Sequence, residues 1–202
     1  MSLWRGAEPL ILASASASRQ LLLQNAGLTF QTVPAALDER LEQQRSGLTE
    51  PGAAAASLAA AKARHVARNF GGHWVLGADQ TLSLGDVVFS KPKDRTEAFD
   101  QLKRLAGKRH ELHSALAVVR NDDVVWQTVA IAHLRMRPLS DQVINGYLDA
   151  AGDKVTTSVG AYQVEGLGVH LFERIDGEHS TILGLPLLPL LDFLRRQGLL
   201  AF

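Results

Sequence analysis

Short apolar segments that alternate with helical patterns are the feature that most limits the fold of this chain. Strand-like runs lie at residues 9–13, 29–33 and 74–78, and helical patterns follow the first two. Such alternation is typical of α/β proteins. We therefore expect an α/β fold in which helices flank a central, mixed and twisted sheet.

The other segments follow from local signals. Gly27 should end a helix that starts among residues 14–18, and Pro51 suits the first turn of an Ala-rich helix that continues to about residue 69. Further helices are expected at residues 96–105 and 140–150 and before Gly198, strands at 113–119, 124–135, 160–164 and 169–175, a hairpin at 82–89, and a polar loop at 38–50.

Composition limits the organisation and the partners. A chain of 202 residues that is 46% hydrophobic can bury one substantial core, so we expect a single domain over residues 1–202 with no separate linker. Lys and Arg number 21, as do Asp and Glu, so no net field favours nucleic acid or an anionic membrane. The absence of cysteine excludes disulfides, thiolate zinc sites and cysteine nucleophiles.

No segment has the signature of a signal peptide or a membrane span. Residues 1–9 lack a sustained apolar region, and the apolar stretch at residues 183–194 is short and contains Pro186, Pro189 and Asp192. We expect a soluble cytoplasmic protein.

The first candidate for chemistry is the segment from Ser14 to Arg19, at a strand-to-helix junction. Ser14, Ser16 and Ser18, the helix N-terminus and the guanidinium of Arg19 could together bind phosphate. The alternative is an ordinary helix cap with an exposed arginine. The segment lacks the Gly-Lys-Ser/Thr of a Walker motif.

A lysine and an aspartate form the second candidate. Lys62 lies four residues from both Leu58 and Val66, which places its ammonium in the apolar stripe of its helix. A carboxylate or a ligand phosphate should therefore meet it, unless the side chain extends to solvent at the edge of the stripe. Asp79 is expected at the end of an apolar strand, where it could hold a divalent ion, accept a proton from water or cap a turn.

Weaker candidates complete the set. Glu39 could supply a second carboxylate or be a solvated loop acid, and Lys91, fixed by Pro92, could bind an anion or simply be exposed. The seven histidines form no zinc motif; His110 and His113 should face opposite sides of a strand, with core or surface roles.

Taken in order, these segments resemble the Maf family of nucleotide pyrophosphatases. The matching pieces are Leu10-Ile11-Leu12-Ala13-Ser14-Ala15-Ser16 with Arg19, Asp38-Glu39, Ala61-Lys62-Ala63, Gly77-Ala78-Asp79-Gln80, Lys91-Pro92, Gly160-Ala161-Tyr162, Glu165-Gly166 and Gly184-Leu185-Pro186-Leu187. Each piece is short, but their order is specific to the family.

The resemblance implies roles for these residues. Asp79 takes the position of the proton acceptor and, with Glu39, of the carboxylates near a divalent metal, Mg²⁺ or Mn²⁺, while Arg19, Lys62 and Lys91 take phosphate-binding positions. It also implies an architecture like that of the inosine triphosphate pyrophosphatases, with two lobes and a cleft, and a homodimer.

The substrate subgroup rests on Ser18, Gln80 and Glu165, which fall at the positions that separate subgroups. Gln80 and Glu165 resemble the 7-methyl-GTP subgroup, whereas Ser18 fits no subgroup, because Ala17-Ser18 replaces the usual Pro-Arg or Pro-Trp. A further departure is Ser158-Val159-Gly160 in place of Lys-Ala-Gly; Lys154 is not aligned with that lysine. The base preference therefore stays open.

The function that follows is hydrolysis of nucleoside triphosphates between the α and β phosphates, with 7-methyl-GTP, UTP or CTP as substrate. Two alternatives remain. One is the related inosine or xanthosine triphosphate pyrophosphatase, and the other is a noncatalytic nucleotide sensor that regulates cell division or septum formation.

Overall fold

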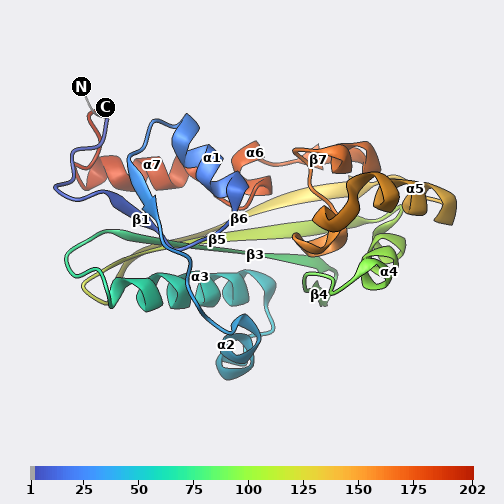
Figure 1. Cartoon of the computed structure of the whole chain (residues 1–202), viewed down its shortest axis with the longest axis horizontal. Coiled ribbons are helices and arrows are strands. Elements are labelled where there is room, and N and C mark those ends of the chain that lie inside the picture. Colours follow the sequence, from blue (N-terminus) through green and yellow to red (C-terminus); the bar gives the residue numbers. More distant parts are fainter. Residues whose placement is uncertain (1–2) are drawn as a thin grey trace. The chain divides into compact units, whose positions relative to one another are not determined.

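The computed structural model describes residues 3–202 and confirms the α/β class with a mixed sheet (Figure 1). The strands are β1 (Leu10–Leu12), β2 (Phe30–Thr32), β3 (Val75–Leu84), β4 (Val87–Phe89), β5 (Arg109–Arg120), β6 (Asp123–Met136) and β7 (Phe172–Asp176). The helices are α1 (Ala17–Asn25), α2 (Glu39–Ser46), α3 (Pro51–Ala67), α4 (Arg95–Leu105), α5 (Asp141–Ala151), α6 (His179–Ile182) and α7 (Leu187–Arg196), with 3₁₀ turns η1 (Gly152–Thr156), η2 (Val159–Ala161) and η3 (Leu167–Leu171).

The strands pair in the order β2-β1-β3-β5-β6-β7, and β4 pairs with β3. Strand β1 is parallel to β2 and β3, whereas the β3–β4 and β6–β7 pairs are antiparallel. Asn121 and Asp122 connect β5 to β6 with φ values of 49° and 69°. Two positive φ values are typical of a tight hairpin turn, so the expected turn is confirmed.

The chain divides into two compact units. Unit 1 comprises Met1–Asp79, Ser114–Ala130 and Gly184–Phe202, and unit 2 comprises Gln80–His113 and Ile131–Leu183. Strands β3, β5 and β6 contribute residues to both. The single domain with two lobes and a cleft stays a prediction.

In unit 1, helices cover both faces of the sheet: α1 and α7 lie on one side and α3 on the other (Figure 1). On the first side, Leu residues of β1, β3, β5 and α7 pack in one buried cluster. On the second side the helix is rich in alanine, and Ala55 and Ala59 pack against Ala115 and Ala117 of β5. Small side chains on both surfaces let α3 approach the sheet closely.

Unit 2 has its own core. Leu82 of β3, Leu102 of α4, Leu134 of β6 and Ile144 of α5 are fully buried in one cluster. Across residues 3–202, no helix combines the length and apolarity that crossing a bilayer requires.

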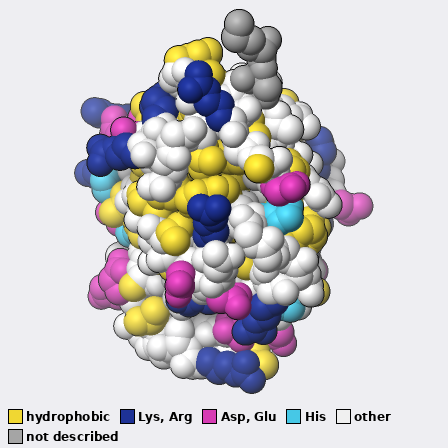
Figure 2. Space-filling model, turned by 90° about the vertical axis from the view of Figure 1, so that its left-hand side faces the viewer, with side chains coloured by type: hydrophobic (Ala, Val, Ile, Leu, Met, Phe, Trp, Pro, Cys, Tyr) yellow, Lys and Arg dark blue, Asp and Glu magenta, His cyan; other side chains and the backbone are white. Residues whose placement is uncertain are grey.

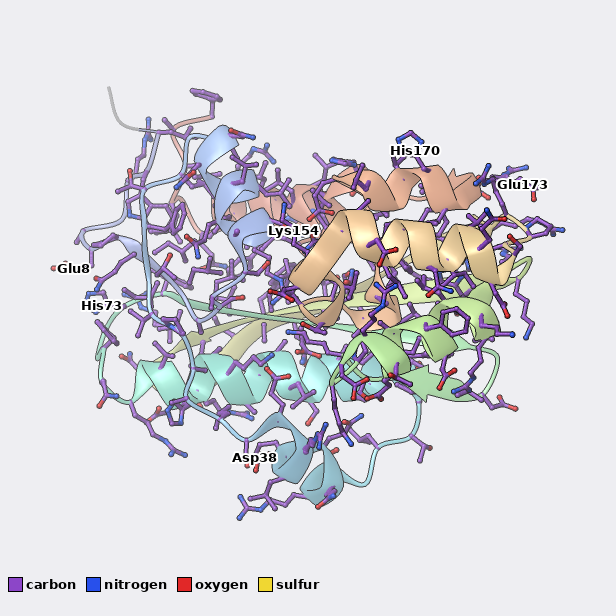
Figure 3. The ribbon with its side chains drawn as sticks, turned by 45° about the vertical axis from the view of Figure 1, so that its right-hand side comes forward. Glu8, Asp38, His73, Lys154, His170 and Glu173 are labelled. Carbon is purple, nitrogen blue, oxygen red and sulfur yellow. The ribbon has the colours of Figure 1, made fainter. Side chains whose placement is uncertain are left out.

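Two expected segments differ from the structure near the candidate site. Residues 39–46 form helix α2 rather than a polar loop; Asp38 caps it by accepting from the N–H groups of Arg40 and Leu41, and Gly47 ends it at a φ of 61° (Figure 3). Strand β3 does not end at Asp79 but continues to Leu84. Asp79 therefore lies in the middle of a strand, and the expectation that it closes one was wrong.

The segment after α5 also differs. Residues 160–164 form no strand: η2 includes Gly160 and Ala161, which have φ values of 75° and 61°. Left-handed backbone of this kind interrupts strand geometry. The expected strand at 169–175 is shorter, because η3 occupies its first residues before β7 begins at Phe172.

Candidate active site

Lys62 is buried and lies between two carboxylates. Its Nζ is 2.6 Å from Oδ1 of Asp79 and 2.7 Å from Oε1 of Glu39. Only 8% of the residue is exposed. The prediction that Lys62 lies in the apolar stripe of its helix was therefore right, and the alternative that its side chain extends to solvent was wrong. The expected acidic partner is present, and it consists of two groups.

Asp79 projects from β3 into the same site. The residue is 6% exposed, and burial raises the pKa of its carboxyl group, while the charges of Lys62 and Arg19 act in the opposite direction. A higher pKa makes the carboxylate a stronger base. The following part of the strand is buried as well: Thr81 and Ser83, at alternate positions after Asp79, have little exposure.

Glu39 reaches Lys62 from the first turn of α2. The helix begins directly after Asp38, so the side chain of Glu39 is carried by a capped N-terminus rather than by a loop. About half of its side chain is exposed, which leaves it accessible from solvent. Glu39 is therefore a partly solvated acid that also pairs with Lys62, and its role near a metal stays a prediction.

Arg19 points inward from α1 and contacts three other segments. Its Nε donates to the carbonyl of Gly184 at 2.9 Å, and its Nη1 donates to the carbonyl of Ala78 at 2.9 Å and to Oγ of Ser14 at 3.0 Å. Desolvation lowers the pKa of Arg19, and the charges of Asp79 and Glu39 oppose that shift. The guanidinium is thus held at the carbonyl of Ala78, the residue directly before Asp79 in the chain.

The serines beside Arg19 have distinct roles. Ser16 is the N-cap of α1, and its Oγ accepts from the N–H of Arg19 at 3.4 Å. Oγ of Ser14 accepts from the N–H of Ser16 as well as from Arg19. Ser18 lies half-buried in the first turn. The ordinary cap is therefore present, but the exposed arginine expected with it is not; phosphate binding by these serines stays a prediction.

Lys91 belongs to unit 2, and its side chain is exposed. Its backbone is held on both sides: Nε2 of Gln101 donates to the carbonyl of Ser90 at 2.9 Å, and Pro92 is buried. Both expectations, a lysine on a fixed loop and a lysine that is simply exposed, agree with this structure. Its convergence with Lys62 and Asp79 stays a prediction.

Gln80 and Glu165, which the resemblance places at substrate-subgroup positions, also belong to unit 2. Gln80 follows Asp79 in β3, and its Nε2 donates to the carbonyls of Thr181 and Ile182 at 3.2 and 3.0 Å. Glu165 is exposed, and its charge helps to raise the pKa of Tyr147 to about 12, mainly an effect of burial. Glu165 thus lies within electrostatic reach of Tyr147.

His110 and His113 have core roles, one of the two kinds of role expected for them. His110 and His113 are buried in unit 2, where Nε2 of His110 lies 2.8 Å from the hydroxyl of Tyr162 and Nε2 of His113 lies 3.2 Å from Oγ of Ser83. Neither belongs to the charged cluster of Lys62.

A divalent cation is compatible with the two carboxylates of this cluster. Among residues 3–202, no group of three or more acidic or histidine side chains could hold a metal by itself. Mg²⁺ is usually bound by one or two carboxylates together with water and substrate phosphates, so a complete protein cage is not required. The oxygens of Asp79 and Glu39 that approach each other here are bound to the ammonium of Lys62, so a cation held by these two carboxylates stays a prediction.

Comparison with known proteins identifies the family of this chain. The model of the family described as Maf-like protein matches residues 9–197. The chain belongs to the Maf family. The matched residues include the cluster of Arg19, Lys62, Asp79 and Glu39.

Relatives of this Maf protein cover all or nearly all of its length. A protein from Rhodopseudomonas palustris (strain BisB18), named nucleoside triphosphate pyrophosphatase, is 57% identical over 202 residues and covers 100% of both chains. A 7-methyl-GTP pyrophosphatase from Rhizobium meliloti (strain 1021) is 55% identical over 192 residues, 94% of this chain and 96% of that one. A solved HAM1 protein from Coxiella burnetii has 18% identity and a TM-score of 0.43 over 63% of this chain and 72% of its own, too distant to support an argument.

Proposed function

We propose that this Maf protein hydrolyses nucleoside triphosphates between the α and β phosphates and releases a nucleoside monophosphate and pyrophosphate. The names of its full-length relatives support nucleoside triphosphate pyrophosphatase activity. The observation that carries the proposal is the buried Lys62, which contacts Asp79 and Glu39 at 2.6 and 2.7 Å. Buried charges at this density are typical of functional sites.

Cations and carboxylates have separate tasks in this scheme. Lys62 and Arg19 bind phosphate oxygens, because a triphosphate carries charge that must be neutralised during phosphoryl transfer. Ser14, Ser16 and Ser18 add hydroxyl or backbone donors at the N-terminus of α1. Lys91 is assigned to the phosphates through its family position, and its exposed side chain is free to reach a ligand.

Asp79 accepts the proton of the attacking water. Its burial supports this role, because the raised pKa brings the carboxyl group closer to the range in which a general base works at neutral pH. Lys62 holds the carboxylate in place at 2.6 Å. Asp79 and Glu39 would also hold Mg²⁺ or Mn²⁺, and the cation would supply a water of lowered pKa together with charge for the phosphates.

The substrate base is assigned to 7-methylguanine first and to the pyrimidines second. Support comes from Gln80 and Glu165 at the subgroup positions and from one relative named for 7-methyl-GTP. Glu165 is exposed and bears a carboxylate, which complements the positive charge of a 7-methylated guanine. Ser18 does not favour either class.

A pyrophosphate-release screen tests the reaction and the base together. Purified protein with Mg²⁺ or Mn²⁺ is given 7-methyl-GTP, UTP, CTP, dTTP and ITP, and pyrophosphate and orthophosphate are measured separately. We expect pyrophosphate from 7-methyl-GTP or a pyrimidine nucleotide, and at least a 100-fold loss, roughly, in Asp79→Asn. Release of orthophosphate alone would contradict cleavage between the α and β phosphates.

The two alternatives predict other outcomes. Preference for ITP in this screen, or for XTP added to it, would favour the inosine triphosphate pyrophosphatase hypothesis. A noncatalytic regulator would keep its cellular effect on division in Asp79→Asn although turnover is lost. The buried acid and lysine pair favours the enzyme, because such a costly arrangement is not needed for a surface that only contacts partners.

Partners beyond the nucleotide remain predictions. The homodimer is an expectation from the family, and sedimentation equilibrium of the purified chain tests it. On the face drawn in Figure 2, basic side chains are dispersed among acidic and apolar ones rather than gathered in one field. The absence of a nucleic-acid partner, expected from the equal numbers of basic and acidic residues, also stays a prediction. The cytoplasmic location also stays a prediction.

A further inference from the structure

The guanidinium of Arg19 connects three segments of unit 1 that are distant in sequence. Its Nη1 binds Oγ of Ser14, at the end of the β1 region, and the carbonyl of Ala78, in β3. Its Nε binds the carbonyl of Gly184, which precedes α7. An arginine has five N–H donors, and the two on Nη2 take part in none of these three bonds. The group is therefore anchored through Nε and Nη1, while Nη2 takes part in none of the anchoring bonds.

Gly184 meets this guanidinium with a backbone that suits glycine alone. Its φ is 83°, in the left-handed region that side chains disfavour. A Cβ at this position would lie 3.1 Å from Nη2 and 3.2 Å from Nε of Arg19. Both the turn that aims the carbonyl at Nε and the space beside Nη2 thus depend on the missing side chain.

We propose that Gly184 is a positioning residue for Arg19 and, through the carbonyl of Ala78, for Asp79. In these contacts Gly184 touches neither Lys62 nor Asp79 and acts only through Arg19. It acts by fixing the guanidinium before a nucleotide arrives. The inference rests on the proposed function for its catalytic consequence, but the coupling between Gly184 and Arg19 is a property of the fold.

The physical reason is preorganisation. A guanidinium that three acceptors hold in one orientation presents Nη2 to a phosphate without loss of further side-chain freedom. The same bonds fix the peptide that carries Asp79, because Ala78 precedes it directly. A displaced Gly184 carbonyl would release one edge of the guanidinium and let both groups shift.

A glycine with a similar positive φ, but with open space where a Cβ would lie, provides the matched control. Gly198 lies in unit 1 with a φ of 71°, and a Cβ there would meet nothing within 4 Å. Gly184→Ala and Gly198→Ala therefore share the backbone strain, and only the first crowds Arg19. Circular dichroism and thermal unfolding establish that both variants are folded.

Steady-state pyrophosphate release is then measured for both variants. We expect Gly184→Ala to lower kcat/KM by about 10-fold or more, with a rise in KM for the triphosphate, because small displacements near the reacting groups are costly. Gly198→Ala should stay within about 2-fold of the parent, as its strain reaches no site residue. Equal kinetics in the two variants would overturn the proposal.

A double-mutant cycle with Arg19→Lys separates positioning from general damage. Lysine has one nitrogen and cannot reproduce the three-way bridge. Gly184→Ala should therefore cost little further kcat/KM in the Arg19→Lys background, whereas additive losses would overturn the proposal.

The same cycle is measured on urea unfolding, which needs no activity. Gly184→Ala should lower the unfolding midpoint more in the parent than in the Arg19→Lys background, and the Gly198→Ala cycle should be additive. If the parent released no pyrophosphate from any nucleotide, the proposed function would fail while the unfolding cycle still decided the coupling. Additive unfolding effects would overturn the positioning role itself.

Discussion

Gly77 of β3 lies directly against Ala59 of α3, so closely that a Cβ on Gly77 would overlap the Ala59 carbonyl oxygen and lie 2.9 Å from the backbone nitrogen of Ala63. This contact sets the spacing between helix and strand in unit 1. Lys62 follows on the same helix and Asp79 on the same strand, two residues beyond Gly77. The close backbone approach thus brings the ammonium and the carboxylate to 2.6 Å.

Gly77→Ala should therefore damage both stability and the site. The added methyl group meets backbone atoms that cannot rotate away, so α3 must move, at a cost of about 1–3 kcal/mol in the free energy of unfolding. The movement carries Lys62 away from Asp79, and pyrophosphate release should fall as well. Urea unfolding and the pyrophosphate assay measure the two effects.

Gly71→Ala is the control for this substitution. Gly71 also lies in unit 1, and a Cβ there would meet nothing within 4 Å. Its effect on unfolding should stay within about 0.5 kcal/mol, as for most surface changes. A Gly77→Ala protein as stable and active as Gly71→Ala would contradict the spacing argument.

Lys62→Met should destabilise the protein at neutral pH, because Asp79 would keep a buried charge without its ammonium. Breaking a buried pair in this way costs about 3–5 kcal/mol. The substitution should raise the pKa of Asp79 further, so the stability deficit grows as the pH rises above the ordinary aspartate range and shrinks as the carboxyl takes up a proton. Urea unfolding at pH 5 and pH 8 tests this direction.

Two variants show whether the charge is the cause. Lys62→Met combined with Asp79→Leu should regain much of the stability, since an apolar pair of similar volume replaces the ion pair, and it should have no activity. Lys103→Met removes an ammonium that lies 3.0 Å from Asp141 with both side chains more than half exposed. That exposed pair should contribute no more than about 1 kcal/mol.

Sequence was sufficient for elements whose hydrophobic pattern matches their surroundings. The α3 helix was predicted from Pro51 and its alanines, and the position of Lys62 in the apolar stripe correctly indicated a buried charge with an acidic partner. The turn at Asn121 and Asp122 was equally clear. In each case the local residue types and the tertiary environment favour the same structure.

Sequence was insufficient where tertiary contacts alone decide. No residue of α2 is buried, so the helix has no apolar periodicity, and only Asp38 and Gly47 mark its ends. The sequence pattern predicts an end to the strand at Asp79, although β3 continues to Leu84. The pattern fails because the polar residues of β3 are buried through partners, such as Lys62, that lie elsewhere in the chain. The anchoring of Arg19 by Gly184 spans 165 residues and leaves no local pattern.

Glu39→Gln should raise the Mg²⁺ concentration required for half-maximal activity by about 10-fold, if Glu39 helps to hold the cation. The amide keeps the size of the side chain but loses its charge toward both the metal and Lys62. Glu42→Gln is the matched control, since Glu42 lies in the first turn of the same helix and pairs with Arg45 at 3.1 Å. A metal dependence that is equal in the two variants would remove Glu39 from the metal site.

His110→Gln should make the protein less sensitive to acid. Burial lowers the pKa of His110 from 6.5 to about 4, so the unfolded chain binds a proton more readily than the folded one between these values. Above about pH 6.5 the imidazole is neutral in both states and does not lower the stability. As the pH falls from there through the folded pKa, the free energy of unfolding decreases by about 3 kcal/mol in all. The free energy of urea unfolding, measured from pH 7 to pH 4, should therefore fall less steeply in His110→Gln than in the parent.

His170, exposed at the surface of unit 2, is the control for this substitution (Figure 3). His170→Gln should keep the parent's slope. A His110→Gln slope equal to the parent's would show that the imidazole of His110 is not the group that titrates.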